Sequence, residues 1–201
     1  MHKWAGAAVW AWAVVAVGQL VGFFAMLGTL RSNLRTVWHD ATSQHPASLQ
    51  SLDLSNLAGV TRLLDVGGMV FAALGVVFLV WQHDAAKVAR GLGYPARISP
   101  GLGVGSWFIP IANLFLPYWS LRDCLPPGHP MRSKALWAWL GYVATGLLGG
   151  TTYVTALFSV VDAIVPLLGT VACVAVAASL GYRLVLAVEH DHTRALAALG
   201  R

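Results

Sequence analysis

Imidazole and carboxylate side chains, which bind first-row metals and move protons, stand side by side at two points of this sequence. His83 and Asp84 follow one long apolar run, and His190 and His192 follow the last one. Histidines two positions apart on a helix point about 200 degrees apart, so they share an ion only where the chain is extended. Because the tail is expected to continue the preceding helix, the sequence predicts no metal site. These four residues are the candidate ligands if one exists.

Motifs for other chemistry are missing from the sequence. No serine or cysteine stands near a histidine–acid pair at the spacing of a nucleophilic triad, and neither a P-loop nor a strand-borne GxGxxG occurs. None of the seven histidines lies inside an apolar run that could hold a buried haem. We therefore expect no cofactor and favour a protein that is not an enzyme.

The stretch 97–125 is apolar enough for a membrane, but it is broken by Gly101, Gly103, Gly105, Pro110 and Pro117. As a helix, residues 107–121 would rise about 22 Å, short of a hydrocarbon core of about 30 Å. Prolines also leave carbonyl groups without helical partners, and Asn113 between the last two could cap the broken backbone. We predict a re-entrant or interfacial helical segment over 105–121, with a fifth full span as the alternative.

The same region resembles a known family. Residues 81–93, which end in Ala-Arg-Gly-Leu-Gly, are followed by SPGLGVGSWFIPIANLFLPYWSLRD at 99–123. The Ser-Pro-Gly entry, the Trp-Phe pair, the Pro-Ile-Ala-Asn core and the Pro-Tyr exit resemble the signature of the bacterial membrane family catalogued as domain of unknown function 4328. The sequence departs from that pattern at Asp84 and Val88, where the family tends toward arginine and asparagine. The resemblance implies a polytopic membrane protein and assigns no activity.

The composition agrees with a membrane protein of one domain over residues 1–201. The chain is 57% hydrophobic and 10% charged, with a mean hydropathy of +0.67, whereas soluble proteins average about 25% charged residues. The net charge of +5 is not concentrated in a stripe dense enough for nucleic acid, so no nucleic-acid partner is expected. Cys124 and Cys173 are expected to stay unpaired.

Hydropathy divides the chain into an all-α arrangement of four transmembrane helices plus the broken segment. The spans are predicted at 5–30, 64–82, 135–158 and 163–188, and an outer polar segment at 31–63 is expected to carry a surface helix over 51–63. Gln19, between Gly18 and Gly22, is expected to find a partner on another helix. Small residues at four-residue spacing, from Gly169 to Gly181, predict a close helix seam, either within the chain or through self-association.

One acidic residue, Asp65, lies just inside the predicted outer end of the second span. An ionisable side chain at membrane depth is a candidate site. The alternative is an ion pair with Arg62 on the same helix, or with Arg31 or Arg35 across the outer interface.

Basic residues fix the expected orientation in the cell membrane, because cytoplasmic loops are rich in lysine and arginine. Those expected to contact lipid headgroups or a partner are Lys87, Arg90, Arg97, Arg122, Arg132 and Lys134. Both termini are then cytoplasmic. Six tryptophans, among them Trp81, Trp107 and Trp139, are expected in an aromatic belt at the cytoplasmic headgroups.

These features predict a non-catalytic accessory or scaffold protein that docks lipid or another membrane protein. The alternative is a small transporter or membrane enzyme with a cavity lined by the broken segment around Asn113. The predicted cavity residues are Trp107, Pro110, Asn113, Pro117 and Tyr118.

Overall fold

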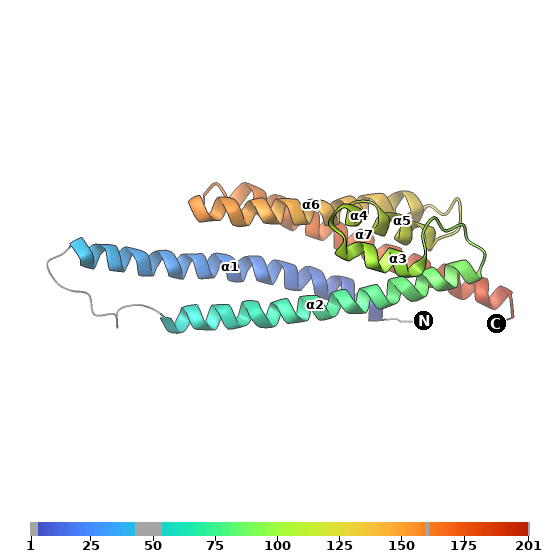
Figure 1. The fold of residues 1–201 in the computed structure, drawn as a ribbon, viewed down its shortest axis with the longest axis horizontal. Coiled ribbons are helices and arrows are strands. Elements are labelled where there is room, and N and C mark those ends of the chain that lie inside the picture. Colours follow the sequence, from blue (N-terminus) through green and yellow to red (C-terminus); the bar gives the residue numbers. More distant parts are fainter. Residues whose placement is uncertain (1–3, 43–53, 160, 201) are drawn as a thin grey trace.

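The computed structural model describes residues 4–42, 54–159 and 161–200, and within them the chain is all-helical. Four helices are long: α1 (Trp4–Thr42), α2 (Leu54–Gly91), α6 (Met131–Phe158) and α7 (Ile164–Ala198). Between α2 and α6 lie four short ones: α3 (Pro100–Gly105), the 3-10 helix η2 (Ser106–Phe108), α4 (Pro110–Asn113) and α5 (Leu116–Asp123). Figure 1 shows the short helices gathered at one end of the bundle, near both termini.

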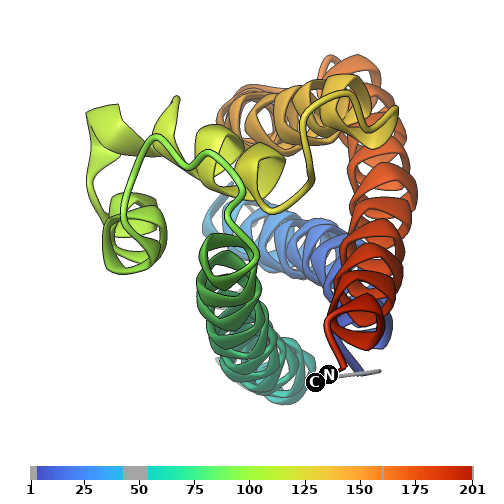
Figure 2. The same cartoon turned by 90° about the vertical axis from the view of Figure 1, so that its right-hand side faces the viewer.

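The long helices pack in the order α2, α1, α7, α6. α1 lies along both α2 and α7, and α6 lies along α7. Seen from one end in Figure 2, the four helices form an open arc, with the short helices beside its α2 and α6 ends. The arc therefore leaves α2 and α6 as its two edges.

The expected polar segment 31–63 is corrected by the structure. α1 continues to Thr42 and α2 already begins at Leu54, so much of this segment belongs to the two long helices and no separate surface helix is present from residue 54 onward. Residues 31–42 contain no glycine or proline, and their hydroxyl groups bond back to the helix, as from Thr36 Oγ1 to the Ser32 carbonyl at 3.1 Å. Polar sequence ends a membrane span but need not end a helix. Residues 43–53, with His45 and the start of the expected surface helix, lie outside the described residues.

The broken segment, predicted as a Pro-broken helical segment over 105–121, consists of several short helices. Three of its four short helices carry a proline in the first turn, where the missing N–H has no helical partner to lose. Ser99 caps α3 by accepting a hydrogen bond from the Leu102 backbone N–H at 3.2 Å. The predicted breaks are therefore confirmed, and each of these prolines starts a new helix rather than kinking an old one.

The two ends of this segment are joined at the buried carboxylate of Asp123. Its Oδ2 accepts from the Arg97 backbone N–H at 3.1 Å, and its Oδ1 accepts from Arg122 and Arg132 at 3.1 and 3.0 Å. Arg132 also donates to the Leu125 carbonyl at 2.6 Å. The chain thus leaves α2 and enters α6 at the same end of the bundle.

Small residues bring the long helices together within this chain. A Cβ on Gly141 of α6 would meet the backbone of Ala177 on α7 at 3.3 Å, and one on Gly181 would meet Val9 of α1 at 3.4 Å. The expected interhelical partner of Gln19 is confirmed, because its Nε2 donates to the Leu64 carbonyl of α2 at 2.9 Å. The predicted seam on α7 is therefore used for packing against both of its neighbours.

Three helices are long and apolar enough to cross a membrane, over residues Trp4–His39, Ala58–Gly91 and Ile164–Ala198. α6, with 28 residues, is long enough as well, but its glycines and threonines dilute its apolar content and it is not among the three. The fourth span, predicted at 135–158, therefore stays a prediction.

Replacing Asp123 should destabilise the fold strongly. Asp123→Ala leaves Arg122 and Arg132 without their shared acceptor in a buried site, a change that costs about 3 kcal/mol or more. Thermal unfolding in detergent should show a lower midpoint, while Asp162→Ala, a change of an exposed carboxylate, should leave it within error. Equal midpoints for both variants would contradict the role given to Asp123.

A cysteine at position 133 tests which side of the membrane this end of the bundle faces. Ser133 is exposed at the start of α6, so Ser133→Cys in a Cys173→Ala background should react with a membrane-impermeant maleimide only from the cytoplasmic side. Labelling is measured in inside-out and right-side-out vesicles. Reaction from the outside would instead make the segment 105–121 a fifth span.

Candidate functional site

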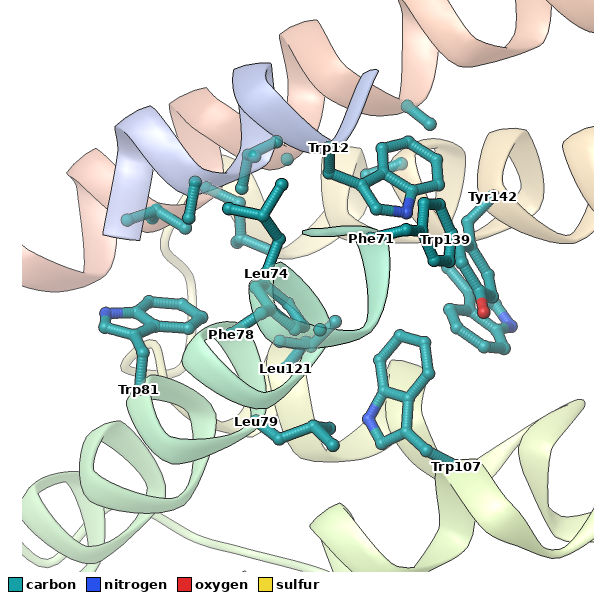
Figure 3. A pocket seen from close by; sticks show the side chains of 18 of the residues that line it. Trp12, Phe71, Leu74, Phe78, Leu79, Trp81, Trp107, Leu121, Trp139 and Tyr142 are labelled. Atoms are coloured by element: carbon teal, nitrogen blue, oxygen red, sulfur yellow. The ribbon is translucent and has the colours of Figure 1, made fainter. Parts of the chain in front are cut away.

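An apolar cavity of about 280 Å³ lies inside the arc, beside the broken segment. Its walls come from α1, α2, α6 and α7, and η2 and α5 close it with Trp107, Phe108 and Leu121. Figure 3 shows Trp107 pointing from η2 toward Trp139 and Tyr142 of α6. No charged side chain is among the described residues that line this space.

Aromatic rings from four elements surround the cavity, and we call this set the aromatic cage. Its members are Trp12, Phe71, Phe78, Trp81, Trp107, Trp139 and Tyr142. Trp107 packs edge-on against Tyr142, with ring centroids 5.1 Å apart, and Trp139 stacks on Tyr142 at 5.2 Å. Trp12 bridges the two edges of the arc, at 5.8 Å from Phe71 and 6.0 Å from Tyr142. Such contacts fix the rings in place.

Three of the four cage tryptophans form hydrogen bonds outside the cavity through their indole N–H groups. Trp107 Nε1 donates to Gln82 Oε1 at 2.8 Å, and Gln82 is fully buried. Trp81 Nε1 donates to Glu189 at 3.1 Å, and Trp139 Nε1 donates to the Leu114 carbonyl at 3.2 Å. Because the indole N–H groups are satisfied elsewhere, these residues offer the cavity their apolar ring surfaces.

A second cavity, of about 370 Å³, continues along the arc toward its other end. It is lined by Gln19, Leu64, Phe71 and Tyr153 among others, and Phe71 lines both spaces. From Leu64 to Trp81, α2 rises about 26 Å, close to a hydrocarbon core of about 30 Å. The two cavities therefore follow the gap between α2 and α6 along most of this length of α2.

Glycines keep this gap open at several points. A Cβ placed on Gly75 of α2, or on Gly146 or Gly150 of α6, would meet no heavy atom within 4 Å. All three glycines line one of the two cavities. A side chain added at any of these positions would therefore begin in open space.

Of the predicted cavity residues, Trp107 lines the space, whereas Pro110, Asn113, Pro117 and Tyr118 are not among the lining residues of either cavity. Asn113 Oδ1 is buried without a hydrogen-bond partner, so Asn113 does not cap the broken backbone through this atom. Pro117 is buried in the first turn of α5. Tyr118 lies beneath the Arg122 guanidinium, 5.7 Å from its ring centroid.

The six predicted basic residues all lie at the end of the bundle that carries the broken segment, and they fall into two groups. Lys87, Arg90, Arg97 and Lys134 are exposed, with Arg97 over the Trp119 ring at 5.5 Å. Arg122 and Arg132 are largely buried against Asp123. Their main contacts are inside the protein rather than on its surface.

The candidate metal ligands do not gather, since no group of three His, Cys, Asp or Glu residues suited to a metal occurs in the described parts of the chain. α7 continues through the tail, so His190 is exposed and His192 is buried, with Nε2 at 2.8 Å from the Cys124 carbonyl. His83 lies half-buried on α2, next to Asp84. The expected opposite orientation of the two tail histidines is confirmed.

Two titratable groups in this region are held neutral. Tyr94 donates to Asp191 at 2.7 Å, and burial together with this bond raises the pKa of Tyr94 to about 12. Burial, with a contribution from the neighbouring Asp123, raises the pKa of the Cys124 thiol to about 12. The hydrogen bond of Tyr94 ties the linker after α2 to the last turns of α7.

Sequence reasoning missed most of the aromatic cage. Trp81 and Trp139, expected in an interfacial belt, are only 1% and 4% exposed and face the interior instead. One signal was available: Phe71, Leu74, Gly75 and Phe78 repeat at helical spacing and mark the inward face of α2. Which helix that face would meet could not be read from the spacing.

Together, the three apolar helices and the apolar cavity define an α-helical architecture compatible with a multi-pass membrane protein. The chain belongs to the family described as domain of unknown function (DUF4328), whose model matches residues 43–190. That match covers α2, the broken segment, α6 and most of α7. No solved structure matches this chain.

The thiol of Cys124 should be inert in the folded protein. At pH 8 a group with a pKa of about 12 carries almost no thiolate, and the side chain is 1% exposed. Intact-mass measurement after treatment with N-ethylmaleimide should show no modification of Cys124 until a denaturant is added. Rapid modification of the folded protein would contradict this packing.

Proposed function

We propose that this protein is a four-span integral membrane protein that holds an apolar lipid chain in the cavity between α2 and α6. The observation that carries the proposal is the cavity itself, which is apolar and lined by the seven rings of the aromatic cage together with Phe108. In this view the protein is a non-catalytic lipid-docking module. Both of its termini lie in the cytoplasm.

The packing of α6 supports the fourth span. α6 lies along α7, and its 28 residues would rise about 42 Å. Large apolar side chains remain exposed along its length, including Leu140, Leu147 and Phe158. A helix with this outer surface is best placed among lipid chains.

The Asp123 contacts support a broken segment that enters the membrane interface and returns. A segment whose ends are joined by hydrogen bonds to one carboxylate has both ends on one side. Phe108, Ile109 and Ile111 are at least half exposed along it, as expected for a lipid-facing wedge. Positive residues then collect on one side, as the positive-inside rule requires.

The lining of the cavity favours a hydrocarbon chain over a polar solute. A solute pathway needs polar groups that replace water, whereas three of the four cage tryptophans direct their N–H groups elsewhere. Asn113, on which the transporter alternative rested, does not line the described cavities. The exposed residues Lys87, Arg90, Arg97 and Lys134 are available for the anionic headgroup of a bound lipid or of its neighbours.

Photocrosslinking with a matched pair of glycine variants tests this function. The protein is reconstituted with a phospholipid whose acyl chain carries a diazirine, irradiated, and the attachment sites are mapped by mass spectrometry. Attachment should occur on cage residues such as Trp12, Phe71 and Trp107. Gly75→Phe should abolish it by filling the cavity, whereas Gly28→Phe, at an equally open position outside both cavities, should not.

Attachment confined to outward-facing residues such as Leu147 and Val165 would contradict the proposal. Unchanged cage labelling in Gly75→Phe would do so as well. Both variants must first show the elution profile of the unmodified protein in mild detergent, because a misfolded variant would lose labelling without filling the cavity.

A further inference from the structure

The outward face of α2 carries two charges where the proposed membrane placement puts hydrocarbon. Arg62 and Asp65 are both exposed, one turn apart, on a stripe that continues through Val66, Met69 and Val76, which are 59%, 72% and 60% exposed. The most apolar window of α2 has no buried residue, compared with 17% of that of α1 and 22% of that of α7. This face is therefore uncovered in the single chain.

The depth of the two charges follows from contacts of the neighbouring residue Leu64. Its carbonyl accepts from Gln19, which lies in the middle of the apolar part of α1, and its side chain shares the second cavity with Gly150 and Tyr153 of α6. From Gly150, α6 rises about 12 Å further to its end. Leu157 and Phe158, at that end, are 62% and 84% exposed. If these side chains contact lipid, Arg62 and Asp65 lie well inside the apolar layer.

Charged side chains at such depth rarely face lipid, because transfer into hydrocarbon is costly and they instead pair or face a protein interior. In the described part of the chain, neither Arg62 nor Asp65 forms an ion pair. Arg31, one of the expected partners of Asp65, donates instead to the Ala156 carbonyl at 3.0 Å. Within the described residues, the two charges are therefore left without an ionic partner.

We propose that the α2 face is a homodimer interface, covered by the same face of a second copy. Two copies with the same membrane orientation are related by a two-fold axis along the membrane normal, which sets the two α2 helices side by side and parallel. Arg62 of each copy then reaches Asp65 of the other, one turn deeper, so that one interaction is made twice. Met69 and Val76, on the same face, pack across the axis. This inference rests on the membrane placement proposed above but not on lipid binding.

Disulfide crosslinking in native membranes tests the dimer. In a Cys173→Ala background, Met69→Cys places a thiol near the axis, and Leu147→Cys places one on the outer face of α6, with 72% and 69% exposure of the native residues. Oxidation should give a covalent dimer with Met69→Cys and leave Leu147→Cys monomeric. Equal crosslinking at both positions, or none at position 69, would overturn the proposal.

Charge variants in the Met69→Cys background test the reciprocal pairs. Arg62→Asp and Asp65→Arg should each reduce the crosslinked fraction at least fivefold, and the double variant should restore it. If the two residues pair only within one helix, all three variants would crosslink as the parent does, and the proposal would fail. Acyl-chain labelling of the cavity should be the same in every variant. Loss of the crosslinked dimer with intact labelling would therefore contradict the dimer proposal alone. Loss of labelling with an intact dimer would contradict the lipid proposal alone.

Discussion

The buried carboxylate of Asp123 is the constraint on which the rest of this structure depends. It accepts a hydrogen bond from the Arg97 backbone N–H at the start of the broken segment. It accepts another from the Arg132 side chain in the first turn of α6. Those bonds close residues 97–132 into a loop with both ends at one position. A loop closed in this way folds back over the end of the bundle, and its prolines divide it into short helices. The buried charge is compensated by two guanidinium groups and a backbone N–H, as burial requires.

The closed loop explains the cavity. The arc of α2, α1, α7 and α6 leaves its edges apart, and small residues tighten only the inner contacts, as where Gly141 meets Ala177. The loop brings Trp107 across this opening, where Gln82 holds the indole by its N–H. The aromatic cage is thus assembled from segments distant in the sequence. Its interior is apolar because its lining is aliphatic and aromatic, and because Trp81, Trp107 and Trp139 make their indole hydrogen bonds outside it.

Much of this could be predicted from sequence, and the failures have physical causes. Proline and glycine act locally, so the breaks in the segment were correctly predicted. The continuation of α1 to Thr42 was missed, because hydropathy reports where a span ends and not where backbone hydrogen bonding ends. Trp81 and Trp139 were misplaced for a different reason. Tryptophan suits both a membrane interface and a protein interior, and only the packing of other helices decides between them.

Native mass spectrometry of the protein released from lipid nanodiscs tests the central claim, a lipid chain held within the arc, most directly. The account predicts that each chain of the unmodified protein keeps one lipid at collision energies that strip the surrounding lipids. The Gly75→Phe variant should emerge bare at the same energies. If the unmodified protein loses all of its lipid at the same collision energy as the Gly75→Phe variant, the cavity does not hold a lipid chain. That result would contradict the account.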